Sequence, residues 1–511
     1  MKHFALAVSV LLACAAAQAQ SPIANLIQNG ERAAALEAVH ARDADVNAAQ
    51  GDGTTPLHWA VYKVDRELVA ALLKAGAKPD VTNRYGSSPL AEAAKLGDLA
   101  LVRQLLDAGA NVESPNGDGE TALMLAARIG ALDVAKLLVE RGADVNAKES
   151  WRNQTALIWA VDNNFPELTQ FLIDHGADPN ARASANDWDS QITAEPRAQY
   201  RPVGGLTVLL YAARSGCTRC VRSLLAAGAD VDKPTPEGMT PLMIAIDNQS
   251  YDTARLLLDE GANPHVWDWY GRTALYIATD MSSFRGRPSH PSSSSETSAT
   301  DVVKLLLEAG VNPNAQMNMH RPSRGGNIGR FNDELLTTGT TPLLRAAIGG
   351  DVEAARLLLE HGALVDLPNV QGLTPLMAAA GHVSGRNQRF DSQQSQAQAI
   401  ELIDLFLAAG ADINARLNED HSLTARVGRQ PNAVTDREGQ TALYGAVKFG
   451  WANVVEHLLA RGADPNVKDA LGKTPLDGAM GRISGGRETV ASDEVAAQLR
   501  AAGAREPSPT R

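Results

Sequence analysis

The stretch TPLHWAVYKVDRELVAALLKAGAKPD, from Thr55 to Asp80, contains two short apolar segments joined by a polar turn. Each segment has the spacing of a helix with one apolar face, and the second ends at Gly76. Neither helix can bury that face alone. The stretch therefore predicts a helix pair that must be covered by another part of the chain.

The same pattern returns along nearly the whole sequence. Its opening Thr or Ser stands at Thr55, Ser88, Thr121, Thr155, Thr207, Thr240, Thr273, Thr341, Thr374, Thr441 and Thr474. Six of the ten intervals between these residues are 33 residues long, and one is 34. A fixed period of this size predicts a solenoid in which each repeat covers its neighbour.

The composition fits a folded protein and excludes one class of partner. Apolar residues make up 44% of the chain and charged residues 21%, which is ordinary for a globular protein. The formal net charge is -12 and no basic tract is present. Because nucleic acid is usually bound by a basic face, we expect no nucleic-acid partner.

The N-terminus resembles an export signal. Lys2 precedes an apolar run that begins at Phe4, and Ala17-Gln18-Ala19 forms a small-x-small cleavage site, so residues 1–19 predict a secretory signal peptide. We expect an exported, periplasmic protein with no integral membrane span. The alternatives are an extracellular protein, a lipoprotein acylated at Cys14, or an uncleaved N-terminal anchor.

Removal of the leader leaves two cysteines, Cys217 and Cys220, in the segment SGCTRCVRSLL. A C-x-x-C pair at a helix start also occurs in thioredoxin-like redox sites. In the repeat register, however, Cys220 takes the position of Val134 and Val454, which indicates a packed core residue. We therefore favour two inert thiols, with a local disulfide in an oxidising compartment as the alternative.

The repeats resemble ankyrin repeats. That family's pattern is T-P-L-H-x-A-A-x-x-G, a second helix ending L-L-x-x-G-A-D, and a β-turn finger. The matching residues are Thr55-Pro56-Leu57-His58 with Gly76-Ala77, Thr207 with Gly216 and Gly228-Ala229-Asp230, and Thr441 with Gly450 and Gly462-Ala463-Asp464. The resemblance implies an all-α solenoid of about 12 stacked helix-turn-helix units. Thr as a helix cap, Pro at the first helical position and Gly after the second helix give the pattern a physical basis.

The register divides the chain into repeats, caps and insertions. The segments are a signal peptide at 1–19, a degenerate N-terminal capping repeat at 20–50, repeats one to four at 51–182, an extended finger at 183–205, repeats five to seven (start) at 206–281, a Ser-rich insert at 282–299, the second helix of repeat seven at 300–316, an extended finger at 317–338, repeats eight and nine (start) at 339–383, a Gln/Ser-rich insert at 384–398, the second helix of repeat nine at 399–416, an extended finger at 417–438, repeats ten and eleven with a C-terminal cap at 439–505, and a tail at 506–511.

Three fingers, the loops between a second helix and the next repeat, are lengthened equally. From Gly176, Gly310 and Gly410 to the Thr that opens the next repeat they span 31 residues, against 12 after Gly462. Because the three lengths are equal, we expect the fingers to form a shared surface. The three fingers contain many Arg residues and no Lys, a choice that favours bidentate contacts to carboxylates or phosphates. The candidate contact residues are Trp188, Tyr200, Arg201, Arg321, Arg324, Phe331, Arg426 and Arg429. The alternatives are that the Arg residues pair with local acids and that the aromatic residues pack within the loops.

A second candidate surface follows from the resemblance, because the fifth residue of each repeat faces the groove of an ankyrin array. That position and the one three residues later give the candidate contacts Trp59, Tyr62, Glu92, Arg128, Trp159, Asp162, Tyr211, Arg214, Asp247, Asp280 and Arg345. Large aromatic side chains beside charges indicate a protein-binding face. The alternative is that the long fingers fold over the aromatic residues and bury them.

No catalytic or metal-binding motif accompanies these surfaces in the sequence. We therefore expect a non-enzymatic protein without a cofactor that binds a partner protein through its groove and long fingers. The alternative from another class is a glycan or cell-wall binding module, with hydrolytic activity as a further option. A third is an effector exported into a host cell.

Overall fold

The computed structural model describes residues 21–41, 45–186, 203–283, 295–318, 338–382, 395–418, 438–481 and 491–506. They form two compact units. The N-terminal unit contains the described residues up to Asn186 together with Val203–Asp230, and the C-terminal unit begins at Val231. The division falls inside the predicted segment 206–281, between repeats five and six.

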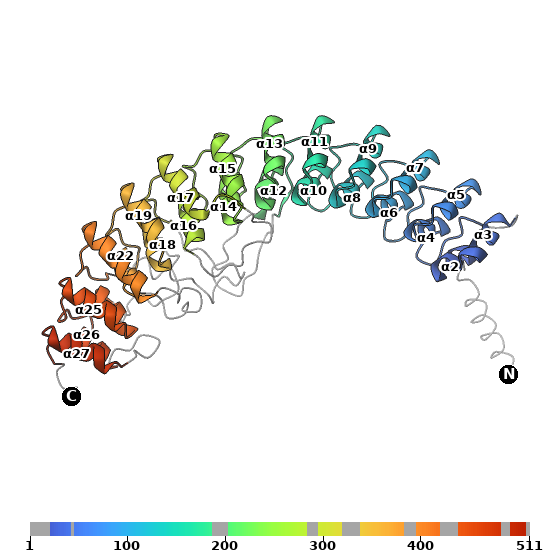
Figure 1. Cartoon of the computed structure of the whole chain (residues 1–511). Helices are drawn as coiled ribbons and strands as arrows, with labels where there is room; N and C mark the ends of the chain where they lie inside the picture. The colour runs from blue at the N-terminus through green and yellow to red at the C-terminus, as the bar shows by residue number, and fades with distance from the viewer. Residues whose placement is uncertain are drawn as a thin grey trace, which may run out of the picture. The chain divides into compact units, whose positions relative to one another are not determined.

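The N-terminal unit consists of six helix pairs (Figure 1). In chain order its helices are α2 (Pro22–Asn29), α3 (Arg32–His40), α4 (Pro56–Tyr62), α5 (Arg66–Lys74), α6 (Pro89–Leu96), α7 (Leu99–Asp107), α8 (Ala122–Ile129), α9 (Leu132–Glu140), α10 (Ala156–Asp162), α11 (Pro166–Asp174), α12 (Val208–Ser215) and α13 (Thr218–Ala226).

The C-terminal unit also consists of six helix pairs. Its helices are α14 (Pro241–Asp247), α15 (Tyr251–Asp259), α16 (Ala274–Ser282), α17 (Ala299–Glu308), α18 (Pro342–Gly349), α19 (Val352–Glu360), α20 (Pro375–Ala379), α22 (Gln396–Ala408), α24 (Ala442–Lys448), α25 (Ala452–Ala460), α26 (Pro475–Ala479) and α27 (Asp493–Ala501). The predicted all-α solenoid of about 12 helix pairs is confirmed.

Two details differ from the sequence-based expectation. Two-residue strands, β1 (Ala185–Asn186) and β2 (Val203–Gly204), pair antiparallel at the base of the first long finger. Helix α22 begins at Gln396, inside the segment expected to be the insert 384–398. Ser395 accepts a hydrogen bond from the backbone N–H of Gln398, so a capping box defines this earlier start.

The repeated Thr residues begin the first helices, as the sequence predicted. The Thr55 hydroxyl accepts from the backbone N–H of His58, and Thr121 and Thr240 cap their helices in the same way. Thr441 is an exception, since its side chain makes no capping hydrogen bond. Each capping bond satisfies a backbone donor that has no partner within the helix.

Packing between repeats buries one face of each first helix. In the N-terminal unit α4 packs on α6, α6 on α8, α8 on α10 and α10 on α12. Leu57 and Ala60 on α4 are fully buried, and Leu209 and Ala212 on α12 are at most 1% exposed. Small Ala residues beside Leu allow neighbouring helices to approach closely. The stretch Thr55–Asp80 is covered from both sides, by α2 and α3 before it and by α6 and α7 after it.

Asn side chains connect neighbouring repeats just after the C-terminal ends of the second helices. Asn146 donates from Nδ2 to the Gly176 carbonyl over 2.9 Å, and its Oδ1 accepts from the Asp178 N–H. Asn414 makes the same two bonds to Gly462 and Asp464. These residues stand four positions after the Gly that ends a second helix, and we call the series the Asn ladder.

Candidate protein-binding groove

The predicted groove residues of the N-terminal unit lie on a row of neighbouring first helices. Trp59 and Tyr62 belong to α4, Glu92 to α6, Arg128 to α8, Trp159 and Asp162 to α10, and Tyr211 and Arg214 to α12. We call this row the groove stripe. Tyr62 is 59% exposed, whereas Tyr211 is buried. The stripe is therefore only partly available to a partner.

One end of the stripe is an aromatic pair. Trp59 and Tyr62 contact edge to face with ring centroids 5.7 Å apart. The Trp59 indole N–H donates to Gln50 Oε1 over 2.8 Å, and Gln50 donates in turn to Asn25 and Gln28. This network fixes the Trp59 ring, so Tyr62 is presented from a rigid base.

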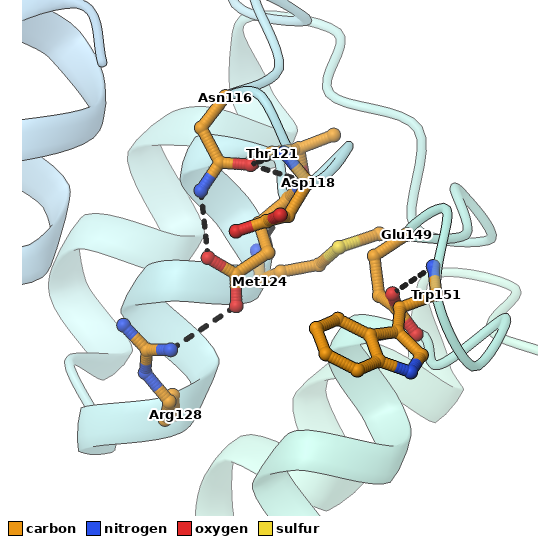
Figure 2. Close-up of polar contacts among 8 residues, drawn as sticks. Asn116, Asp118, Thr121, Met124, Arg128, Glu149 and Trp151 are labelled. Carbon is orange, nitrogen blue, oxygen red and sulfur yellow. Dashed lines mark hydrogen bonds and ion pairs between the residues drawn. The ribbon is translucent and has the colours of Figure 1, made fainter. Parts of the chain in front are cut away.

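The middle of the stripe contains an Arg held in place by its own repeat. Asn116 Nδ2 and an Arg128 guanidinium N–H both donate to the carboxylate of Glu120, over 2.7 and 3.1 Å (Figure 2). Arg128 also lies 5.6 Å from the ring centroid of Trp159. Among the described residues the Trp159 indole N–H has no hydrogen-bond partner. Arg128 is thus oriented before any ligand binds.

The far end of the stripe contains a bridge between repeats. Arg214 pairs with Asp162 at 2.7 Å and lies 4.8 Å from the ring centroid of Tyr211. The Tyr211 hydroxyl accepts from the Gln154 amide over 3.0 Å. Tyr211 is only 5% exposed, so its expected place on an open groove is corrected: it packs in the core because α12 lies directly against α10.

The remaining groove residue of this unit is also bonded internally. Glu92 accepts a hydrogen bond from the Ser87 hydroxyl over 2.7 Å. The acids and Arg residues of the stripe therefore have partners within the unit. A ligand would meet aromatic rings and the outer faces of fixed ion pairs, not isolated charges.

The C-terminal unit supplies Asp247, Asp280 and Arg345. Arg345 Nε bonds Asp280 over 2.5 Å, and Arg345 is 4% exposed. The expectation that Arg345 contacts a partner is corrected, because packing of α16 on α18 encloses this ion pair. Asp247 is half-buried on α14, beside Tyr251. Burial and the nearby Asp247 charge raise the pKa of Tyr251 to about 12.

Sequence reasoning missed a set of exposed aromatic residues on the ordinary fingers. Tyr85 and Trp151 are 76% and 75% exposed, and Trp267 and Trp269 are 65% and 52% exposed. The Glu149 carboxylate accepts the backbone N–H of Trp151 (Figure 2). It also accepts the N–H groups of Arg152 and Gln154, and these bonds shape the finger that carries Trp151. A large aromatic within a turn segment was the available signal.

The residues proposed for the long fingers lie outside the described residues. They are Trp188, Tyr200, Arg201, Arg321, Arg324, Phe331, Arg426 and Arg429. Two other finger Arg residues are described. Arg182 donates to the Gly205 carbonyl, and Arg416 donates to the carbonyls of Gly439 and Lys468. Both side chains bond to backbone carbonyls, which is neither the acid pairing nor the ligand contact that the sequence suggested for finger Arg residues.

The two cysteines correct the interpretation that we favoured. Cys217 and Cys220 form a disulfide, and both are buried at the start of α13. The expected core position of Cys220 is confirmed, since its side chain is fully buried and contacts the Thr169 hydroxyl. The pair is therefore a local bridge within packed core, and the inert-thiol interpretation is wrong.

The described part of the chain lacks two other features. No helix there is long and apolar enough to cross a membrane. The same part of the chain contains no group of three or more His, Cys, Asp or Glu side chains arranged to hold a metal ion. The signal-peptide segment 1–19 and Cys14 lie outside it.

The geometry defines a class of protein: a solenoid of helix pairs with capped first helices and protruding turns. Models of ankyrin repeats match residues 7–116, 90–183, 191–268, 209–317, 295–416 and 428–479. The chain belongs to the ankyrin-repeat family. Arrays of this family typically mediate protein–protein interactions.

Known relatives share this array over part of their length. The chain is 30% identical over 258 residues to the mouse B-cell lymphoma 3 protein homolog, covering 50% of this chain and 43% of the relative. It is 29% identical over 272 residues to human ankyrin repeat and SOCS box protein 16, covering 53% and 47%. The chain thus spans less than half of these relatives. The human ASB11 ankyrin repeat domain aligns with TM-score 0.39 and 21% identity, over 48% of this chain and all of that one.

Proposed function

We propose that this protein binds a partner protein through the groove stripe of its N-terminal unit. The observation that carries the proposal is Tyr62, an aromatic side chain 59% exposed on a base fixed by Trp59 and Gln50. Exposed aromatic and Arg side chains are the groups that contribute most to protein interfaces. Membership of a family whose arrays typically bind proteins supports the same function.

The charges of the stripe support a preorganised interface. Arg128 is held by Glu120 and packs near Trp159, while Arg214 is held by Asp162. Immobilising a long side chain on binding costs about 0.5–1.5 kcal/mol, so side chains already fixed reduce that cost. The partner is expected to present complementary carboxylates or carbonyl groups to the outer faces of these Arg residues.

Export and the absence of catalysis remain part of the proposal. The leader-like residues 1–19 support export to the periplasm, and the Cys217–Cys220 disulfide is of a kind that persists in oxidising compartments. The function needs no reaction and no cofactor. Binding through the long fingers, and the glycan or cell-wall alternative built on them, stay predictions.

The test is capture of partners from the native cell by proximity labelling, followed by a binding titration with the purified partner. Tyr62→Ala is expected to weaken binding by roughly tenfold or more, as truncation of an interface anchor does. Leu364→Ala is the matched control, because Leu364 is 58% exposed on the C-terminal unit. A partner whose affinity is unchanged by Tyr62→Ala and Arg128→Ala would exclude the groove stripe as its binding site.

A further inference from the structure

A polar cleft lies in the C-terminal unit, at the bases of the three successive fingers that follow repeats seven, eight and nine. Its volume is about 690 Å³, which is within the range of small-molecule sites. The first finger contributes Gln316 and Asn318, the second Asp366 and Asn369, and the third Arg416. Polar groups from three repeats therefore line one cavity.

Asn369 is the most informative residue of the cleft, because it is only 4% exposed. Its Oδ1 accepts the backbone N–H groups of Gln371 and Leu373 over 3.0 and 3.1 Å. Its Nδ2 has no hydrogen-bond partner among the described residues. A buried amide donor left unpaired is unfavourable, so a ligand acceptor there would gain a bond that water cannot easily supply.

Another finger of this chain satisfies the corresponding Asn side chain internally. Asn116 stands five residues before its helix-capping Thr, as Asn369 does, and its Nδ2 donates to Glu120 over 2.7 Å (Figure 2). The residue that corresponds to Glu120 is Leu373, which has no side-chain acceptor. The unpaired donor thus results from this one difference between two fingers.

Asp366 lines the same cleft and adds an acceptor. Its Oδ2 accepts from the Asp412 N–H over 3.0 Å, while its buried Oδ1 has no partner among the described residues. Arg416 donates from Nε and from a terminal nitrogen to the carbonyls of Gly439 and Lys468. With two carboxylates nearby and these Arg donors occupied, the cleft does not suit an anion.

We propose that the cleft binds a neutral polyhydroxylated ligand, a mono- or oligosaccharide. A hydroxyl group both donates and accepts, so neighbouring hydroxyls satisfy Asp366 Oδ1 and Asn369 Nδ2 together. The amides of Gln316 and Asn318 offer further donors and acceptors at the rim. Gly372 allows the third finger to approach, because a side chain there would clash with the Asn418 backbone. The site is independent of the groove stripe.

The experiment screens the full chain against a printed panel of neutral mono- to tetrasaccharides, then titrates the best one calorimetrically. Asn369→Asp keeps the side-chain oxygen that accepts the two turn N–H groups and removes the Nδ2 donor. Asp occupies the corresponding place at Asp268 and Asp469. Leu373→Gln supplies an internal acceptor for Nδ2, and Gln occupies that place at Gln154 and Gln440. Each variant is expected to weaken binding roughly tenfold.

Asn83→Asp is the matched control, because it makes the same change at the corresponding position of the N-terminal unit. It should bind the sugar like the unmodified chain, and circular dichroism should show all variants folded. A pull-down on insoluble polysaccharide distinguishes a polymer from a free sugar as the ligand. The proposal is overturned if no sugar on the panel binds, if both cleft variants bind normally, or if the cleft captures a peptide instead.

Discussion

His58 shows how much one side chain determines at a repeat boundary. Its Nε2 contacts the Ser87 carbonyl at 2.9 Å, and since a carbonyl only accepts, Nε2 carries the hydrogen. Its Nδ1 then accepts the Thr55 N–H at 3.2 Å. The neutral ring therefore completes the cap of α4 and bonds to the next finger at the same time.

This arrangement predicts a pH-dependent stability. Burial lowers the pKa of His58, against the opposing effects of the Ser87 bond and of Glu92 and Asp52. The neutral ring's contribution is fully present above the unfolded pKa of about 6.5 and is lost as pH falls from there towards the lowered folded pKa. Urea midpoints of the unmodified chain should fall across that window. His58→Gln, which retains a capping-box side chain, should show a flatter profile. Equal pH slopes in the two proteins would contradict this account.

At the scale of elements, the Asn ladder adds hydrogen bonds between one helix pair and the next to the apolar packing of the helices. Where Asn occupies the ladder position, it both donates and accepts; where Asp occupies it, only the acceptor remains. Asp80 accepts the Asn111 N–H, whereas Asn146 bonds both Gly176 and Asp178. The N-terminal unit thus contains ladder positions with one hydrogen bond to the next repeat and ladder positions with two.

Exchanging the two residue types should change stability in opposite directions. Asn146→Asp removes the donor to Gly176 and is expected to lower the free energy of unfolding by about 1 kcal/mol. Asp80→Asn adds a donor towards the following repeat and is expected to raise it by up to a similar amount. Urea titrations at one pH give both values. The ladder would have no energetic role if the two changes had the same sign.

At the scale of the whole molecule, ion pairs between second helices repeat along the N-terminal unit. Arg32 bonds Asp65, and Arg66 bonds Asp98 at 2.8 Å one repeat later. Burial by itself would raise the pKa of Asp98. The hydrogen bonds from Arg66 and the Leu101 N–H outweigh that effect, so its pKa lies below the usual value, and Asp65 behaves likewise with Arg32.

Acid should therefore weaken the array. A carboxylate with a lowered pKa stabilises the folded state above its unfolded pKa of about 3.9, and that contribution disappears as pH falls through the folded value. The free energy of unfolding is expected to decrease from about pH 5 downward in denaturant titrations. Asp98→Asn should be less stable at neutral pH and lose less on acidification. An unchanged acid slope in that variant would show that Asp98 does not contribute.

Much of this molecule was fixed by local signals in its sequence. The interval of 33 residues, the Thr and Pro at helix starts and the Gly at helix ends predicted helix pairs at the positions where they are found. These signals act within a few residues, because caps and left-handed turns are short-range interactions. The groove stripe as a row on first helices was predicted from this register together with the resemblance to ankyrin repeats.

Only the tertiary structure decided which of those residues face solvent and which bonds they use. Arg345 is buried in the contact between α18 and α16, where it pairs with Asp280, a residue 65 positions earlier in the chain. Tyr211 is buried where α12 packs on α10. The cleft that Asn369 lines likewise depends on residues of three fingers meeting in space. A repeating pattern specifies what each helix is, whereas exposure and hydrogen bonding depend on the particular side chains that its neighbours bring to the contact.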